Sequence, residues 1–251
     1  MKNRLEKKIK SKAFFIRILV KRLFKIKSST KFLEIDQIQD LLKNKKNISV
    51  ICSGPSANQI KPNDNDLYLV TNDSFKLVSN YDFLYYVNDG YFFKRFLALA
   101  PFNDNHINNI FFYRDEDHLH HRSFNYFMKH KDLLFGNNFL LSDIHEDGMF
   151  NNNYYQFIKN LKKFEIPIKF QNSGIFLLLF GFYLAEKYNK VLKIYGLDLG
   201  VGGNRHFEKG GHVGKSITND RVKINTKKQL DIIYRHLGEN VKNYSYFNSN
   251  Q

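Results

Sequence analysis

Short apolar runs that each end on polar or glycine residues recur along the first half of the chain. They occupy residues 48–52, 66–70, 81–87 and 109–113. Runs of this length, rich in β-branched and aromatic residues, predict strands, and the stretches between them predict short crossover helices. This alternation is typical of an α/β domain with a mostly parallel sheet.

The segment 171–216 is the part around which we expect the domain to be organised. Residues 175–185 are apolar on every side, which predicts a helix buried on all of its faces. A strand is predicted at 191–195, and a loop rich in Gly, His, Arg and Lys follows it. A polar loop at the carboxyl end of such a strand is where an open α/β sheet binds its ligand.

The remaining pattern completes one domain. We predict a strand at 138–141, a helix at 153–164, a helix at 223–237 and a last strand at 241–247. Residues 31–47 predict a polar helical connector. The chain is therefore divided into an extension and connector, 1–47, and a single domain, 48–251.

Composition fits a folded domain that lacks disulfides. The chain has 251 residues, of which 43% are hydrophobic, and this is enough to bury a core. The single cysteine, Cys52, excludes an intramolecular disulfide or a cysteine metal cage, and its apolar strand predicts a buried side chain. We expect no signal peptide, because Arg17, Lys21 and Arg22 interrupt the N-terminal apolar residues. We also expect no membrane span, since no run reaches roughly 18–20 apolar residues. These features favour a cytoplasmic location.

The positive charge is concentrated at the N-terminus. Residues 1–30 hold eleven Lys and Arg against one acid, Glu6, and so carry +10 of the net charge of +15. Large apolar residues interleave with the cations at 14–25, which predicts a basic amphipathic helix on an anionic membrane surface. The apolar content favours a membrane over nucleic acid, and a helix packed on the domain is the remaining alternative.

The first predicted strand ends in a turn suited to a phosphate or nucleotide. Ser53 and Gly54 open this turn, and Pro55 and Ser56 continue it. Exposed backbone N–H groups gather where a strand passes through a glycine turn into a helix. The turn lacks the three spaced glycines of the dinucleotide fingerprint.

The order of several motifs resembles that of bacterial CMP-sugar glycosyltransferases of the Campylobacter-type sialyltransferase family. The motifs are Ser53-Gly54-Pro55-Ser56, Asn72 and Asn88 after later strands, Asn172-Ser173-Gly174, Gly196-Leu197-Asp198 and Gly214-Lys215-Ser216. The block Gly196-Leu197-Asp198-Leu199, followed by Gly202, Arg205, Phe207 and Glu208, is similar to lipopolysaccharide-core Kdo transferases. The likeness covers about residues 48–248.

This resemblance implies a single Rossmann-like (GT-A-like) domain that binds a CMP-sugar without a metal or other cofactor. The implied donor contacts are Ser53, Gly54, Asn72, Asn88, Ser173, Gly174 and Asp198. Small residues admit backbone to phosphate, and asparagine offers donors and acceptors to ribose and base. Ser, Asn and Gly are also ordinary turn and cap residues, so a purely structural role is the alternative for each.

The catalytic loop departs from the sialyltransferase pattern, which has a histidine base where this chain has Lys215. We expect His212 to be the general base, with His206 as the second choice, because imidazole titrates near neutral pH. Arg205, Lys209 and Lys215 are expected to neutralise the departing CMP phosphate. A surface-loop role is the alternative for each histidine.

The preferred hypothesis is an inverting glycosyltransferase that transfers Kdo or sialic acid from a CMP donor to a lipopolysaccharide or lipooligosaccharide acceptor. It would lie on the inner face of the bacterial inner membrane. One alternative is a metal-dependent transferase of UDP- or GDP-sugars using Asp115 and Asp117, beside which His118, His120 and His121 also suggest a metal. The other is a non-catalytic α/β protein that binds nucleic acid through the basic tail.

Overall fold

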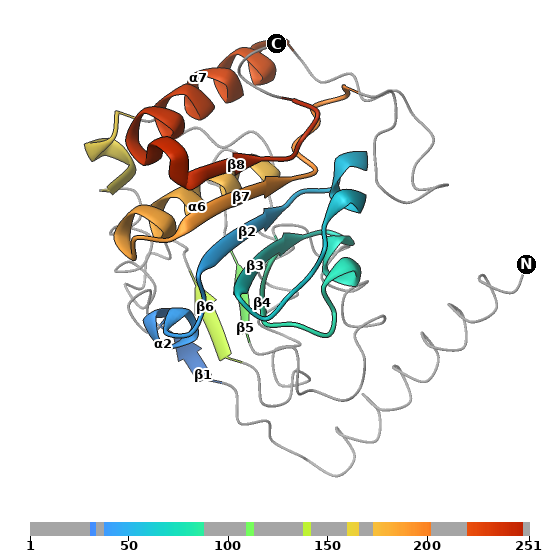
Figure 1. Ribbon diagram of the computed structural model, residues 1–251, viewed down its shortest axis with the longest axis vertical. Coiled ribbons are helices and arrows are strands. Elements are labelled where there is room, and N and C mark those ends of the chain that lie inside the picture. The colour runs from blue at the N-terminus through green and yellow to red at the C-terminus, as the bar shows by residue number, and fades with distance from the viewer. Residues whose placement is uncertain are drawn as a thin grey trace, which may run out of the picture.

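The computed structural model describes residues 31–33, 38–87, 109–112, 138–141, 160–165, 173–201 and 220–247 (Figure 1). Eight strands of this part form one sheet. They are β1 Lys31–Leu33, β2 Asn47–Ile51, β3 Asp66–Thr71, β4 Phe83–Val87, β5 Asn109–Phe112, β6 Asn138–Leu141, β7 Val191–Tyr195 and β8 Val241–Asn243. Their order is β1-β6-β5-β4-β3-β2-β7-β8, and each neighbouring pair is parallel. The predicted α/β class is confirmed.

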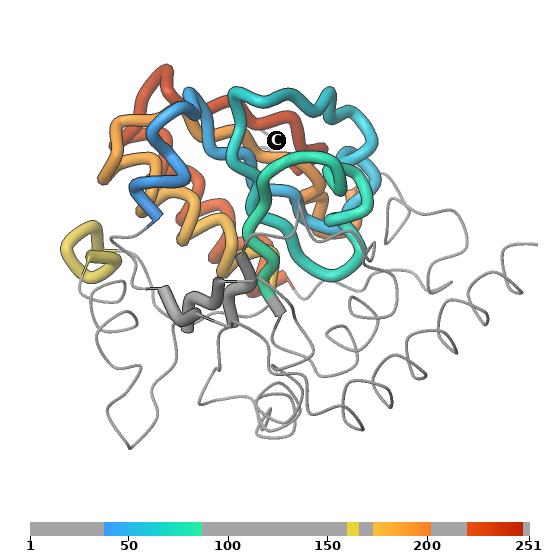
Figure 2. Tube along the Cα trace, turned by 90° about the horizontal axis from the view of Figure 1, so that it is seen from below, coloured from blue at the N-terminus to red at the C-terminus, as the bar shows by residue number. Residues whose placement is uncertain are grey.

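Two long helices accompany the sheet in the described part of the chain. These are α6, Ser173–Lys187, and α7, Asp220–Leu237. The shorter elements are α2 Ile38–Leu42, η2 Pro55–Gln59, η3 Ser74–Leu77 and η6 Gly238–Asn240, and residues 160–163 are also helical. In Figure 2 the orange and red helices lie together on one side of the sheet.

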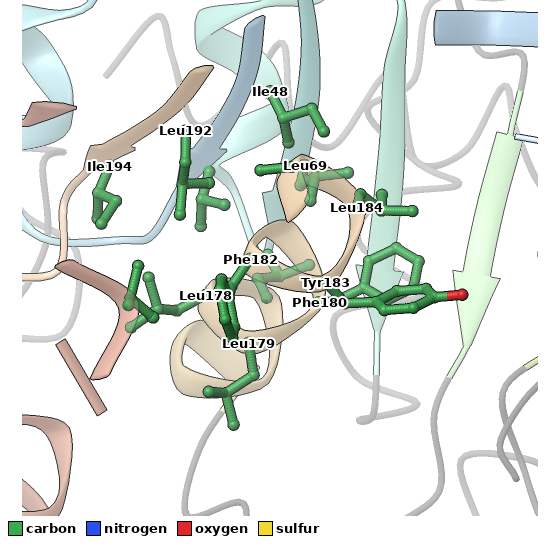
Figure 3. Packing of buried hydrophobic residues seen from close by; sticks show 14 of the residues in the cluster. Ile48, Leu69, Leu178, Leu179, Phe180, Phe182, Tyr183, Leu184, Leu192 and Ile194 are labelled. Atoms are coloured by element: carbon green, nitrogen blue, oxygen red, sulfur yellow. The ribbon is translucent and has the colours of Figure 1, made fainter. Parts of the chain in front are cut away.

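The helix α6 forms the centre of the hydrophobic core. Its residues 175–185 are all buried, as the uniformly apolar pattern predicted. Alternate residues of the strands face it, including Ile48 and Val50 of β2, Leu69 of β3 and Leu192 of β7 (Figure 3). On its other side α6 contacts α7, whose Leu230 and Ile233 complete the cluster.

The opposite face of the sheet combines aromatic and polar side chains. Tyr68 and Tyr85 are fully buried there, and Phe75 of η3 packs edge-on against Tyr85 at a centroid distance of 5.7 Å. Burial raises the pKa of Tyr68. Its hydroxyl accepts a hydrogen bond from the N–H of Asn63 and donates one to the carbonyl of the same residue. One face of the sheet is thus apolar and covered by α6, and the other carries hydrogen-bonding groups in its interior.

The prediction of a helical connector over 31–47 is wrong for Lys31–Leu33, which form β1 and pair with β6. A three-residue strand has no local periodicity, so its sequence does not reveal that it pairs with a strand more than a hundred residues away. The helical part of the connector is α2, and its Ile38 and Leu42 are buried in the core. The core therefore includes residues that precede the predicted start of the domain at residue 48.

The last predicted strand, 241–247, is shorter than expected. Regular pairing stops at Asn243, and the N–H of Ser245 then donates to Oδ1 of Asn243 (2.9 Å). This side-chain acceptor turns the backbone away from the ladder, as asparagine commonly does. Helix α7 begins three residues earlier than the predicted 223 and ends where expected. Within the described ranges, none of the helices combines the length and apolarity that crossing a membrane requires.

Candidate functional site

The direction in which the chain adds strands reverses between β2 and β7. From β2 the chain passes through β3 and β4 on one side, and later returns to place β7 on the other side of β2. In open α/β sheets ligands bind beyond the carboxyl ends of the strands at such a switch point. Here that position lies between the Ser53-Gly54 turn after β2 and the Gly196-Leu197-Asp198 turn after β7 (Figure 1).

The carboxylate of Asp198 joins three segments at this position. Ser56 donates to it twice, from its N–H to Oδ2 (2.8 Å) and from its hydroxyl to Oδ1 (2.5 Å). The N–H of Tyr246, beyond β8, also donates to Oδ1 (2.8 Å). Asp198 is only 2% exposed, so these donors replace water around it. The side chain therefore fixes the turns after β2 and β7 and the segment after β8 relative to one another.

Two glycines allow the turns to touch. The N–H of Gly54 donates to the carbonyl of Gly196 (2.9 Å), and a Cβ at Gly54 would clash with Oδ2 of Asp198 and lie 2.6 Å from that carbonyl. Gly196 has φ +70° and faces the carbonyl oxygen of Cys52, which would lie 2.5 Å from a Cβ. Only glycine combines this close approach with a left-handed backbone at Gly196. The two glycines are buried, and they allow the turns after β2 and β7 to pack directly on each other.

The turn after β3 meets the turn after β2. Nδ2 of Asn72 donates to the hydroxyl of Ser53 (3.1 Å), and Asn72 itself has φ 54°, which asparagine tolerates better than most residues. Nearby, the hydroxyl of Ser74 donates to the carbonyl of Ile51 (2.9 Å) and accepts from the N–H of Thr71 (3.0 Å). Ser53 and Asn72 thus lie together, with hydroxyl and amide groups half-buried at the carboxyl edge.

The N-terminus of α6 reaches the same edge. The carbonyl of Gly174 lies 3.7 Å from Sγ of Cys52, the residue that directly follows β2. Cys52 is buried as predicted, and burial, with a smaller contribution from the charge of Asp198, raises the pKa of its thiol. Helix N-terminal N–H groups carry a partial positive charge, which favours an anion in front of them. Ser173 and Gly174 are thereby placed beside the Ser53 turn.

A buried hydroxyl near this helix end has no hydrogen-bond partner. Thr71 ends β3 on the face that α6 covers, and its Oγ1 is unpaired although the residue is only 1% exposed. Its neighbour across the ladder, Tyr86, stacks on Phe176 in the first turn of α6 at a centroid distance of 4.5 Å. Sequence reasoning did not single out Thr71, because its distinguishing feature is the unpaired hydroxyl, which only the structure shows.

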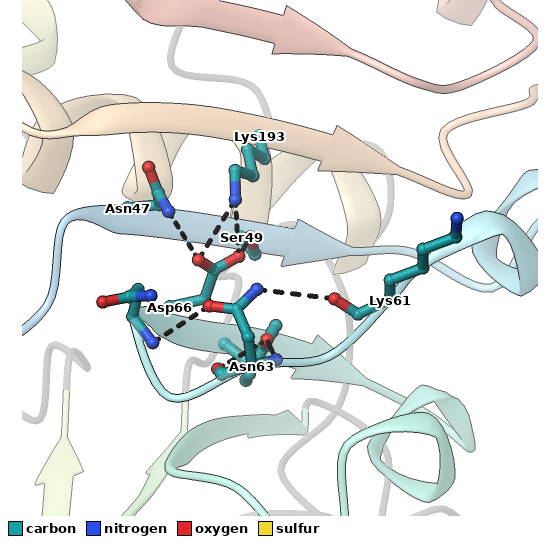
Figure 4. Close-up of polar contacts among 8 residues, drawn as sticks. Asn47, Ser49, Lys61, Asn63, Asp66 and Lys193 are labelled. Carbon is teal, nitrogen blue, oxygen red and sulfur yellow. Dashed lines mark hydrogen bonds and ion pairs between the residues drawn. The ribbon is translucent and has the colours of Figure 1, made fainter.

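A second buried carboxylate lies at the amino ends of the same strands. Asp66, the first residue of β3, accepts from Nδ2 of Asn47 (2.5 Å) and from the hydroxyl of Ser49 (2.7 Å) on β2 (Figure 4). Nζ of Lys193 on β7 reaches over β2 and lies 3.0 Å from Oδ2. This network faces away from α6 and lies at the opposite end of the strands from the Asp198 cluster.

The candidate catalytic residues and the alternative metal ligands lie outside the described residues. These are Arg205, His206, Lys209, His212 and Lys215 of the loop, Asn88 of the donor set, and Asp115, Asp117, His118, His120 and His121 of the alternative. Within the described ranges, no group of three or more His, Cys, Asp or Glu is arranged as a metal site. Asn88 directly follows β4, a parallel neighbour of β3. The roles of all these residues stay predictions.

Sequence reasoning also missed Ser56 and Tyr246 as structural partners of Asp198. Both residues donate hydrogen bonds to the carboxylate of Asp198, and neither belongs to a local sequence motif that includes it. Ser56 and Asp198 are 142 residues apart in the sequence. A serine after proline in a strand-end turn was the only local signal for Ser56. Comparisons with protein-family models, with curated proteins and with solved structures find no match to this chain.

Taken together, the carboxyl edge offers a set of groups suited to a phosphorylated ligand. A helix starts at Ser173, and uncharged donors and acceptors lie beside it at Ser53 and Asn72. The buried Asp198 is engaged by Ser56 and Tyr246, so its contribution in this conformation is to hold the turns.

Proposed function

We propose that the chain is an inverting glycosyltransferase that transfers a 2-keto sugar acid, Kdo or sialic acid, from its CMP-activated donor. The acceptor would be a lipopolysaccharide, a lipooligosaccharide or a related lipid-linked glycan. The observation that carries the proposal is the meeting of the Ser53 turn, Asn72 and the start of α6 at the switch point. These are three of the segments that the motif resemblance assigns to the donor.

The chemistry of these segments supports a nucleotide monophosphate as the leaving group. The N-terminus of α6 favours the phosphate, because the start of a helix presents backbone N–H groups to an anion. The amide of Asn72 and the hydroxyl of Ser53 can bond ribose hydroxyls and the edge of a pyrimidine. In this proposal the domain is Rossmann-like (GT-A-like), and the donor lies across the carboxyl ends of β2 and β3.

The proposed reaction is a single displacement. His212, or else His206, removes the proton from an acceptor hydroxyl, whose oxygen then attacks the anomeric carbon of the sugar acid. The bond from that carbon to the phosphate oxygen breaks, and CMP leaves with the electron pair. Arg205 and Lys215 stabilise the charge that develops on the phosphate. No metal takes part in this scheme.

Thermal unfolding in the presence of CMP, UDP and GDP tests the donor class directly. A ligand at a hundred times its Kd stabilises the folded state by about 2.7 kcal/mol, which for a domain of this size is roughly 5–10 °C in Tm. We expect this shift with CMP and a much smaller one with UDP or GDP. Equal shifts with all three, or none with CMP, would contradict the proposal.

Transfer assays separate the proposal from the metal-dependent alternative. Activity from a CMP-sugar onto a short oligosaccharide acceptor is expected to persist in EDTA, whereas an enzyme using Asp115 and Asp117 would lose it. His212→Ala is expected to abolish transfer while CMP still raises Tm. Near-normal turnover of that variant would assign the base to His206 or to another residue.

A further inference from the structure

Thr71 carries a hydroxyl whose state the fold alone does not explain. Within the part of the chain that the structure describes, its Oγ1 has no hydrogen-bond partner, although the residue is only 1% exposed. The N–H of the same residue donates to the hydroxyl of Ser74 (3.0 Å), so the missing bond concerns the side chain alone. An unpaired buried hydroxyl lowers stability, and a protein that keeps one often uses it for a ligand.

The side chain of Thr71 lies on the face of the sheet that α6 covers. Side chains alternate between the two faces along a strand, and Leu67 and Leu69 of the same strand belong to the core cluster around α6. Across the ladder Thr71 is the register partner of Tyr86, which belongs to the same cluster. Thr71 therefore faces α6 from the carboxyl end of β3.

The first turn of α6 contacts the residues on both sides of Thr71. On one side the ring of Tyr86 stacks on that of Phe176, with centroids 4.5 Å apart. On the other side is Cys52, which the register of β2 with β3 brings level with Thr71, and its Sγ lies 3.7 Å from the carbonyl of Gly174. Neighbouring strands are only about 4.8 Å apart. The hydroxyl of Thr71 is therefore directed at the N-terminus of α6.

A hydroxyl in front of a helix N-terminus suits an oxyanion. The start of the 15-residue helix α6 carries a partial positive charge, which attracts an anion and disfavours a cation. A threonine hydroxyl can donate to such an anion. Ser53 and Asn72 add a second hydroxyl and an amide beside it, and neither is charged. Neutral donors together with a helix start are common components of phosphate sites.

We propose that the hydroxyl of Thr71 donates a hydrogen bond to a phosphate group of the ligand that binds in front of α6. Thr71 is then a binding residue that none of the sequence motifs includes. The inference deepens the proposed function and rests on it for the nucleotide, since the phosphate would be that of the CMP moiety. The contact with phosphate itself can be tested without a nucleotide.

The residues around Thr71 indicate how the phosphate would reach it. The strand ends and the helix start beside it carry four residues that are each half-buried, namely Ser53, Asn72, Ser173 and Gly174. Thr71 lies one residue further in along β3 than Asn72, so its hydroxyl would be the innermost contact. Because Thr71 is enclosed in this conformation, the start of α6 must open locally to admit the phosphate. On the side of β2 the contact that must give way is the long one of the Cys52 thiol, which is a weak donor.

Two substitutions separate the hydroxyl from the rest of the side chain. Thr71→Val keeps the shape and removes an unpaired hydroxyl, so we expect the free protein to gain stability, with Tm raised by about 2–4 °C. Thr71→Ser keeps the hydroxyl and loses a buried methyl group, so Tm should fall by about 2–4 °C. Stability and ligand binding should therefore change in opposite directions in the two variants, which a purely structural role of Thr71 would not produce.

Thr226→Val is the matched control. Thr226 is also fully buried, but it lies in α7 and its hydroxyl donates to the carbonyl of Val222 (2.7 Å). Removing this hydroxyl should not raise Tm, and it should leave ligand binding unchanged. If Thr71→Val lowers Tm as Thr226→Val does, the hydroxyl of Thr71 is already bonded in the free protein and the inference is wrong.

Thermal unfolding of the four full-length proteins in inorganic phosphate tests the contact without a nucleotide. Phosphate also stabilises proteins generally, because it is excluded from their surface, so the measure is the difference between variants relative to chloride at equal ionic strength. The wild type, Thr71→Ser and Thr226→Val should show an additional rise in Tm that Thr71→Val lacks.

Calorimetry with CMP and cytidine shows which part of the nucleotide Thr71 contacts. Thr71→Val should bind CMP about tenfold more weakly than the wild type, because a hydrogen bond to a charged oxygen is lost, and should bind cytidine equally well. Thr71→Ser and Thr226→Val should stay within about twofold for both ligands. An equal loss of cytidine affinity in Thr71→Val would assign Thr71 to the nucleoside and contradict the inference.

The outcomes distinguish this inference from the proposed function. If all four proteins respond equally to phosphate and equally to CMP, Thr71 binds no phosphate and the inference is wrong, whereas the proposed function still stands if CMP binds. If phosphate separates Thr71→Val from the others while CMP has no effect, or an effect independent of Thr71, the phosphate contact stands and the CMP donor is wrong.

Discussion

Asp66 and Asp198 are equally buried, at 2% exposure each, but they hold different parts of the molecule. The partners of Asp66 are side chains of strands, Asn47 and Ser49 on β2 and Lys193 on β7. The partners of Asp198 belong to turns, and two of its three donors are backbone N–H groups. Asp66 therefore fixes strands in register, whereas Asp198 fixes the loops that surround the candidate site.

The two aspartates also differ in the charge of their hydrogen-bond partners. Lys193 is a counter-ion for Asp66, with its Nζ 3.0 Å from the carboxylate, whereas the hydrogen bonds of Asp198 in the described structure come from uncharged donors. A buried ion pair can be replaced by two apolar residues with little loss of stability, because neither charge is then left buried without a partner. Exchanging side chains for apolar ones leaves the backbone N–H donors in place, so a carboxylate bound by them has no such replacement.

The largest effect is expected for Asp198→Ala. The change leaves the N–H groups of Ser56 and Tyr246 and the hydroxyl of Ser56 without their acceptor, and the free energy of unfolding should fall by about 4 kcal/mol. The turns also lose their common anchor, so stabilisation by CMP should disappear in protein that still folds. Urea unfolding at neutral pH and thermal shifts with CMP measure the two effects. Retained CMP binding in the folded variant would show that the turns hold their shape without Asp198.

A somewhat smaller effect, confined to stability, is expected for Asp66→Leu. It leaves Lys193 without its counter-ion, and because that side chain is 16% exposed we expect a loss of about 3 kcal/mol rather than more. Combining Asp66→Leu with Lys193→Met should recover the part of the loss that comes from the unpaired lysine, but not the part that comes from Asn47 and Ser49, which still lack their acceptor. Urea unfolding of the two single variants and the double variant gives the coupling. CMP affinity should stay within about twofold in each variant that folds. A loss of CMP binding in the double variant would contradict the separation between the two carboxylates.

The smallest effect is expected at Asn72, where a left-handed backbone and a bond to Ser53 coincide. Asn72→Ala keeps the positive φ and loses the bond, and should lower the free energy of unfolding by about 1 kcal/mol. Asn72→Gly loses the same bond but removes the strain of a side chain at positive φ, so the free energy of unfolding should change little. If the amide contacts the donor, calorimetry should find CMP affinity reduced equally in both variants. Reduced affinity in the alanine variant alone would assign the effect to the backbone.

The strand pattern was predictable because each run is apolar and ends abruptly. The predicted ends placed Ser53 and Asn72 after neighbouring parallel strands, and the structure brings their side chains within hydrogen-bond distance. The uniformly apolar stretch 175–185 also gave the buried helix α6 without ambiguity. The local sequence carries this information because burial and strand ends determine which residue types occur at each position.

Contacts between distant segments were not predictable. Neither Ser56 nor Tyr246 has a local pattern that indicates a buried aspartate as its partner, and Lys31–Leu33 pair with β6 without any periodicity of their own. For the same reason Asp198 was predicted as a donor contact from its place in a motif. The structure shows which protein groups donate to its carboxylate, namely Ser56 and the N–H of Tyr246. Its direct contact with a CMP-sugar stays a prediction.

The position of β2 in the middle of the sheet has a consequence for how the protein is made. One neighbour of β2 is β3, which follows it closely, but the other is β7, which the ribosome delivers more than a hundred residues later. Until then one edge of β2 lacks its partner, and the apolar face of the growing sheet lacks α6. Long-range parallel pairing of this kind folds slowly and exposes hydrophobic surface meanwhile. The nascent chain is therefore expected to depend on chaperones until Val191–Tyr195 has emerged.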